Sequence, residues 1–128
     1  MKLLDTTVLI DILRGNKDTH KILNQKQLFL TTQINMFEVI RGLFLQRITS
    51  SRFHQVLEMF DNIRVLQLDD HAMIKSAQIS SSLIEKGNMI SDNDCLIAGI
   101  ALSNGVTTIL TKNVKDFKKI PELKLETY

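Results

Sequence analysis

The chain has 128 residues, of which 44% are hydrophobic and 23% charged, the composition of one globular domain with its own core. A single cysteine and three scattered histidines exclude a disulfide scaffold and a zinc finger, because neither can be built from so few ligands. The net charge of +2 is compatible with a polyanionic partner without identifying one.

The first residues, MKLLDTTVLIDIL, have the apolar character of a signal peptide, but Asp5 and Asp11 interrupt the stretch and no small-residue cleavage site follows. No apolar run approaches the length of a membrane span. We therefore expect a cytoplasmic protein that has no membrane partner and consists of one domain over residues 1–128.

Short apolar runs alternate with longer segments of helical periodicity along the whole chain. Strands and helices in such alternation form a mostly parallel sheet with helices on both faces. We expect an α/β fold, a three-layer α/β/α sandwich with four to five strands. In chain order the predicted elements are strand Lys2–Leu4, helices Thr6–Arg14 and Asn16–Gln25, strand Leu28–Leu30, helices Gln33–Arg47 and Ser51–Asn62, strand Ile63–Leu68, helix Asp70–Lys86, helix Asp92–Asn104, strand Thr107–Leu110 and a last strand near Leu123–Glu126.

Polar residues follow three of the predicted strands. Asp5 comes after the first strand, Thr31 and Thr32 after the second, and Thr111 and Asn113 after the fourth. Parallel sheets bind their ligands in the crevice outside the carboxyl ends of the strands. These residues therefore mark the expected functional edge of the sheet.

Asp5 has two interpretations. As the residue between a strand and a helix it is a helix N-cap, whose side chain accepts a backbone N–H bond. At the same place it is a candidate ligand, and the neighbouring Thr6 can bind a phosphate or a water molecule.

Asp94 precedes the run Cys95–Leu102, which is apolar on every side and therefore predicts a buried helix. A carboxylate at the mouth of such a helix is costly unless a cation or another partner compensates its charge. Ser91 as N-cap with Asp94 three residues later also matches a capping box, and both roles are compatible. We expect Asp92, on the other side of the same turn, to cap the helix or face water.

Glu38 lies on a mixed face of the helix Gln33–Arg47, where a solvated side chain is the simple interpretation. Its position shortly after the second strand makes it a candidate for the same crevice. The remaining aspartates of interest are expected to be solvated or capping residues without chemistry: Asp11, Asp61, Asp69 and Asp70.

If Asp5, Glu38 and Asp94 converge, their like charges require a cation. Hard oxygen ligands select Mg²⁺ or Mn²⁺, and the sequence offers no Cys/His set for zinc. A divalent ion on carboxylates binds phosphate oxygens and activates water for in-line attack. The implied reaction is hydrolysis of a phosphodiester bond.

Four segments resemble the motifs of PIN-domain ribonucleases, and most closely those of VapC-type toxins from toxin–antitoxin pairs. LDTTVLIDILRG is similar to the first motif with Asp5 as its acid, FEVIRG to the second with Glu38, and NDCLIAGIAL to the third with Asp94. The order and spacing of the segments cover nearly the whole chain.

The segment ILTKNVKDF resembles the fourth motif through the spacing of Thr111, Asn113, Asp116 and Phe117. Many members of the family have an aspartate where this chain has Asn113, which supplies an amide oxygen but no charge. Either Asp116 serves as the fourth acid, or it is a solvated or capping residue. A weaker second metal site follows as a hypothesis.

The resemblance implies a PIN-like fold and a Mg²⁺- or Mn²⁺-dependent endoribonuclease that is a homodimer and is silenced by a cognate antitoxin. It implies that the metal ligands are Asp5, Glu38 and Asp94. It further assigns Asp116 as a catalytic candidate and the supporting residues Thr6, Thr111 and Asn113.

RNA binding requires cations near the crevice, because contacts to phosphates supply most of the sequence-independent affinity. The candidates are Arg14, Arg41, Lys112 and Lys115, in the first helix, on the Glu38 face and in the last motif. For each one a solvated charge is the alternative interpretation.

Two adjacent predicted helices carry more large apolar residues than one modest core requires. Either these residues are core, or part of them forms a groove for an antitoxin helix. The two sets are Met36, Phe37, Ile40 and Phe44, and Phe53, Val56, Leu57 and Phe60.

Other functions have sequence requirements that this chain does not meet. A receiver domain needs an acidic pair after the first strand, a haloacid-dehalogenase phosphatase needs Asp-x-Asp where this chain has Thr7, and nucleotide folds need a glycine-rich phosphate loop. Two alternatives within the family stay open: an RNA-processing PIN nuclease without an antitoxin, and a non-catalytic PIN-like domain that binds RNA or protein.

Overall fold

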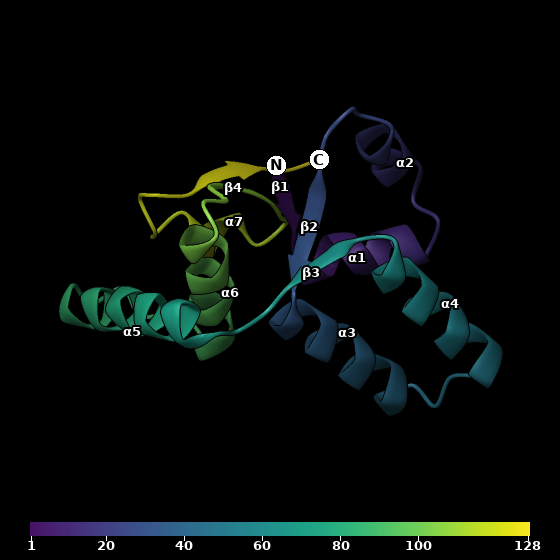
Figure 1. Ribbon diagram of the computed structural model, residues 1–128, viewed down its shortest axis with the longest axis horizontal. Helices are drawn as coiled ribbons and strands as arrows, with labels where there is room; N and C mark the ends of the chain where they lie inside the picture. Colours follow the sequence, from purple (N-terminus) through teal and green to yellow (C-terminus); the bar gives the residue numbers. More distant parts are fainter.

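The computed structural model describes residues 1–128 as a five-stranded sheet with seven helices (Figure 1). In chain order the elements are β1 (Lys2–Leu4), α1 (Thr6–Leu13), α2 (Lys17–Leu23), β2 (Phe29–Thr32), α3 (Gln33–Leu45), α4 (Ser50–Asp61), β3 (Arg64–Leu66), α5 (Asp70–Glu85), α6 (Asp92–Ser103), β4 (Thr108–Leu110), α7 (Val114–Phe117) and β5 (Lys124–Glu126).

The first strand lies at the centre of the sheet, whose order is β3-β2-β1-β4-β5 with every neighbouring pair parallel. Leu3 of β1 is in register with Leu30 of β2 and with Ile109 of β4. The strand order reverses at β1, so the carboxyl ends of β1 and β4 form the topological switch point at which such sheets bind ligands.

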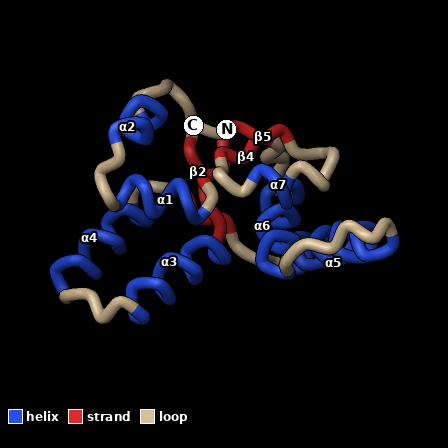
Figure 2. The backbone as a smooth tube through the Cα atoms, turned by 180° about the vertical axis from the view of Figure 1, so that it is seen from behind, coloured by secondary structure: helices blue, strands red, loops and turns tan.

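Successive residues of a strand point to opposite faces of the sheet, and this alternation divides the core in two. Leu3 and Ile109 pack in one apolar cluster with residues of α5, α6 and α7, while Leu4 and Leu110 pack in another with residues of α1, α3 and α4. Seen from behind in Figure 2, the sheet lies between these two groups of helices, and the two chain termini lie side by side.

The close contact between α5 and α6 depends on one glycine. A Cβ atom at Gly99 would lie 1.9 Å from the hydroxyl of Ser76 and 2.7 Å from its backbone nitrogen. Only glycine allows the two backbones to approach this closely. The packing holds α6, and with it the N-terminal turn that carries Asp94, against the sheet.

The predicted α/β/α sandwich is confirmed, and the sheet is entirely parallel. Most element ends lie within one or two residues of the predictions, and the larger differences concern two strands and one helix. The second strand extends through Thr31 and Thr32, because their side chains are buried and satisfied by hydrogen bonds within the fold. The third strand is shorter, Arg64–Leu66, and the short helix α7 was not predicted. None of the helices combines the length and apolar character needed to cross a membrane.

Candidate active site

Asp5 lies at the carboxyl end of β1, buried to 4% exposure, and is the N-cap residue of α1. Its carboxylate makes no cap hydrogen bond to that helix. Instead it accepts bonds from the amide of Asn35 at 3.1 Å and from the hydroxyl of Thr111 at 2.6 Å. The side chain of Asp5 therefore does not cap α1, and its role as a metal ligand stays a prediction.

Glu38 lies on α3 one turn beyond Asn35, and it is half-buried rather than solvated. The hydroxyl of Thr6 donates to its Oε1 at 2.8 Å, and the amide of Asn93 donates to its Oε2 at 3.4 Å. Asn35 also donates to the hydroxyl of Thr6 at 3.0 Å. Asn35 therefore donates both to Asp5 and to Thr6, the residue that holds Glu38.

Asp94 is half-buried in the first turn of α6, whose N-cap is Ser91 as expected: the Ser91 hydroxyl accepts the Asp94 backbone N–H at 3.2 Å. The carboxylate of Asp94 accepts a bond from the amide of Asn113 at 3.1 Å. The Asn113 backbone N–H in turn donates to the hydroxyl of Thr111 at 2.8 Å. The fourth motif therefore touches both Asp5 and Asp94.

No lysine or arginine forms an ion pair with Asp5, Glu38 or Asp94. Burial, followed by the charges of the neighbouring acids, Asp5 first, raises the pKa of Asp94 to about 6. The pKa of Asp5 is also raised, mainly by burial and further by Glu38, against the lowering effect of the Thr111 hydrogen bond. Three acidic side chains therefore lie at this edge of the sheet, and the side chains that donate hydrogen bonds to them are all uncharged.

The donor set matches a hard divalent cation in type and charge, since it consists of carboxylate, amide and hydroxyl oxygens. The acids are not drawn into a ready cluster, because no three Asp, Glu, His or Cys side chains lie close enough together to share an ion. They are near enough for Asp5, Asp116 and Glu38 all to raise the pKa of Asp94. An ion at this edge would relieve that repulsion.

Asp116 lies in α7 and is half-buried. Its charge contributes to the raised pKa of Asp94, while its carboxylate is 3.9 Å from the ammonium of Lys119. It therefore differs from the other three acids in having a cation beside it.

The four RNA-binding candidates lie in different surroundings. Arg14 is exposed and lines a pocket that Glu38 also lines. The expectation that Arg41 shares the face of Glu38 is wrong, because Arg41 lies over the ring of Phe37 at 5.1 Å and lines the apolar pocket of α3 instead of the pocket that Glu38 lines. Lys115 is exposed and forms no ion pair, so its role in RNA binding stays a prediction.

Lys112 is held by the chain itself. Its ammonium lies 3.1 Å from Asp11 and 4.5 Å from the ring centre of Tyr128, and the Tyr128 hydroxyl donates to the same carboxylate. The expectation that Asp11 is simply solvated or capping is wrong, because this half-buried acid ties the last residue of the chain to the loop of the fourth motif.

Two asparagines of the site were not singled out in the sequence. Asn35 is fully buried and bonds to Thr32, Asp5 and Thr6, and Asn93 bonds to Glu38. The available signal for Asn35 was its position three residues after Thr32, which caps α3 by accepting the Asn35 backbone N–H.

The apolar residues of α3 and α4 divide between the two interpretations. Val56 and Phe60 are buried core, whereas Phe37 and Phe44 are 56% and 67% exposed. Phe44 packs against Phe53 with ring centres 5.7 Å apart. The exposed part forms an apolar face on α3, defined by Met36, Phe37, Ile40, Phe44 and Leu45.

Comparison with known proteins agrees with this arrangement. The family model for the PIN domain matches residues 2–123. The "tRNA(fMet)-specific endonuclease VapC" of Salmonella typhimurium is 30% identical over 98% of this chain and 96% of its own length. "Ribonuclease VapC1" of Methanocaldococcus jannaschii is also 30% identical, over 98% of this chain and 85% of its own.

Solved structures give the same result for the fold. DNA-bound VapBC from Salmonella typhimurium is 27% identical with a TM-score of 0.86, covering 98% of this chain and 96% of that one. VapBC2 from Rickettsia felis shares the fold at 22% identity, with a TM-score of 0.88 over 99% of this chain and 98% of that one. The chain belongs to the PIN-domain family. Its relatives over nearly the full length are VapC ribonucleases, which confirms the resemblance carried by the four motifs.

Proposed function

We propose that this protein is an endoribonuclease that hydrolyses RNA phosphodiester bonds with Mg²⁺ or Mn²⁺ and serves as the toxin of a toxin–antitoxin pair. The observation that carries the proposal is the group of three acids at the switch point of the sheet, none of which is paired with a cationic side chain. The family supports the ribonuclease class, since its relatives of this length are named ribonucleases or endonucleases.

Asp5, Glu38 and Asp94 are the residues that would hold the ion, and their side chains would have to move closer together to share it. When bound, such an ion lowers the pKa of a water molecule and polarises phosphate oxygens. The chain's own task is to orient the acids: Asn35 and Thr111 fix the carboxylate of Asp5 by hydrogen bonds at 3.1 and 2.6 Å. Because these donors are neutral, they orient the charge without cancelling it.

The other two acids, Glu38 and Asp94, are also oriented by uncharged hydrogen-bond donors. Thr6 holds Glu38, and Asn113 holds Asp94. Asp116 is the remaining acid near Asp94, but its neighbour Lys119 offsets its charge. We expect a second ion to bind weakly, because Asn113 supplies no charge and Asp116 has a cation beside it.

The substitution Asn113→Asp tests this second site. It adds a carboxylate beside Asp94, so RNA cleavage should reach half its maximal rate at a lower Mn²⁺ concentration than in the wild type. A titration of cleavage rate against Mn²⁺ measures the difference. An unchanged midpoint would show that position 113 does not contribute to metal affinity.

The proposed reaction is tested by comparing the wild type with Asp94→Asn and Asp92→Asn on structured RNAs, with Mn²⁺ and with chelator. One relative acts on tRNA(fMet), so this RNA heads the panel. Asp92 is the matched control, since it lies on the same helical turn but is exposed. We expect Asp92→Asn to cleave like the wild type and Asp94→Asn to lose at least about 100-fold in rate. Cleavage that survives the chelator, or equal cleavage by all three proteins, would refute the metal-carboxylate mechanism.

The toxin role is tested in cells. Expression of the wild type should arrest growth, Asp5→Asn should abolish the arrest, and co-expression of a small protein encoded beside the gene should relieve it. Arrest without such a protein would favour an RNA-processing nuclease. Absence of both arrest and cleavage would favour a non-catalytic PIN-like domain.

We assign the apolar face of α3 to the antitoxin, because several of the structures that share this fold are VapBC toxin–antitoxin complexes. Phe37 and Phe44 are large and more than half exposed, as an unoccupied helix-binding surface requires. The substitution Phe44→Glu should weaken antitoxin binding in a pull-down while RNA cleavage continues. A homodimer is expected as well, and light scattering of the purified protein measures it.

A further inference from the structure

A pocket of about 110 Å³ lies directly beside Glu38, between α1, α3 and the start of α4. Five of its ten lining residues are hydrophobic, and the other five are polar, charged or glycine. The apolar residues are Ile10, Leu13, Val39, Leu43 and Ile48, and the remaining ones are Arg14, Glu38, Gly42, Gln46 and Arg52.

Neither of the two arginines of the pocket, Arg14 and Arg52, forms an ion pair, and Asp11 is the one acid outside the pocket on which the charge of Arg14 acts. Arg52 is nevertheless fixed in place, since its guanidinium donates to the carbonyl of Leu13 at 2.7 Å and to the side chain of Gln55 at 3.0 Å. Two cations against one acid, Glu38, make the pocket suited to an anionic ligand.

Gly42 keeps the wall of this pocket open. It lies inside α3, where glycine is less favourable than alanine, and a Cβ built there meets no atom within 4 Å. Gly99 contrasts with it, because there the packing of two helices leaves no room for a side chain. Packing therefore does not require glycine at position 42, and its effect is to leave space beside Glu38.

We infer that this pocket binds one nucleotide of the RNA next to the bond that is cleaved, an inference that rests on the proposed function. In this arrangement the base packs against the apolar residues of the pocket and presents its edge to Gln46, while a phosphate oxygen lies near Arg14. Unstacked bases of single-stranded RNA are recognised in this way, by apolar or guanidinium surfaces together with hydrogen bonds to the base edge. The unpaired arginines favour RNA over a protein partner.

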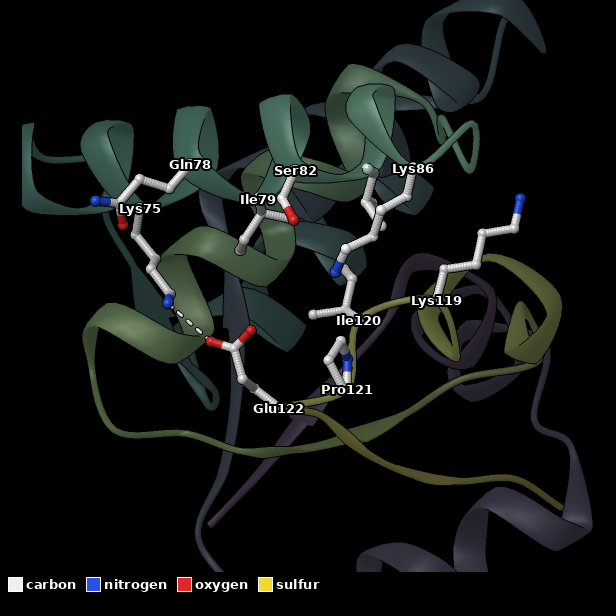
Figure 3. Close-up of a pocket in the computed structure, with 10 residues that line it drawn as sticks. Lys75, Gln78, Ile79, Ser82, Lys86, Lys119, Ile120, Pro121 and Glu122 are labelled. Carbon is white, nitrogen blue, oxygen red and sulfur yellow. Dashed lines mark hydrogen bonds and ion pairs between the residues drawn. The ribbon is translucent and has the colours of Figure 1, made fainter.

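Gly42→Ala adds a Cβ atom, which meets no atom within 4 Å, Gly42→Leu adds a larger side chain at the same place, and Arg14→Ala removes an exposed charge. Lys86→Ala is the control for lost charge, since Lys86 lines a different pocket, between α5 and residues 119–122, which neither Asp5, Glu38, Asp94 nor Asp116 lines (Figure 3). The probe is a library of RNA hairpins with randomised loops, cleaved with Mn²⁺ and sequenced. Circular dichroism checks the fold of each variant.

We expect Gly42→Leu and Arg14→Ala to raise KM about tenfold or more and to change the preferred nucleotide beside the cleavage site, with a smaller effect for Gly42→Ala and none for Lys86→Ala. Unchanged KM and unchanged preference in both Gly42→Leu and Arg14→Ala, with an active wild type, would overturn the inference. Loss of antitoxin binding with normal RNA cleavage would also overturn it, and would assign the pocket to the protein partner. Failure of the wild type to cleave any RNA would instead refute the proposed function.

Discussion

The substitution Asp94→Asn should make the metal-free protein more stable at neutral pH. Asparagine has the shape of aspartate and keeps an oxygen for the Asn113 amide, which donates to Asp94 at 3.1 Å. The substitution therefore removes mainly the negative charge that the site concentrates. A residue placed for catalysis is expected to cost stability in this way.

The magnitude follows from the pKa of Asp94, which rises from 3.8 to about 6 through burial first and the charge of Asp5 second. A difference of one unit between the folded and unfolded pKa is worth about 1.4 kcal/mol, so complete ionisation costs the folded state at most about 3 kcal/mol. Solvent around the half-buried carboxyl reduces this to about 1–2 kcal/mol. The folded state binds the proton of Asp94 more tightly than the unfolded state does. The wild type is therefore free of this cost below about pH 4, and it loses the corresponding stability as the pH rises to about 6 and above.

Thermal denaturation followed by circular dichroism in chelator measures the effect. At pH 7.5 the Tm of Asp94→Asn should exceed that of the wild type by about 3–10 °C, and the gap should shrink by more than half at pH 4.5. Added Mn²⁺ should raise the Tm of the wild type more than that of the variant. An equal or lower Tm for the variant at pH 7.5, or a gap independent of pH, would refute the argument that unpaired charge strains this site.

Two further predictions concern packing. Gly99→Ala should lower the free energy of unfolding by about 1–3 kcal/mol in urea denaturation, because a Cβ there meets the backbone of Ser76. Adding Ser76→Ala should not restore it, and full rescue would show that the hydroxyl alone is in the way. Tyr128→Phe should lower the free energy of unfolding by about 1 kcal/mol through loss of the bond to Asp11, and unchanged stability would mean that this bond is not formed in solution.

The fold was predictable because its signals are local and agree with one another. Apolar runs, helical periodicity and residues such as Ser91 and Asp69 that cap helices as expected from their type give the order of the elements. The short helix α7 escaped because four residues carry too little periodicity to be distinguished from a loop.

The three acids could be proposed from the ends of strands and the spacing of motifs, whereas their supports could not. Asn35 in the sequence is one polar residue in the first turn of a helix, and only the approach of α3 to β1 brings it to Asp5. The same holds for the contact of Tyr128 with Asp11, which joins residues 117 positions apart. Local patterns carry no information about partners so distant in sequence.

The hydrogen bond between Asp5 and Thr111 has a consequence for the time at which the protein becomes active. It joins residues 106 positions apart, and β4 must dock beside β1 before the bond can form. A chain that stops short of Thr111 therefore contains Asp5, Glu38 and Asp94 but lacks the bond that orients the carboxylate of Asp5. The site is therefore complete only when the segment that carries Thr111 has packed beside β1.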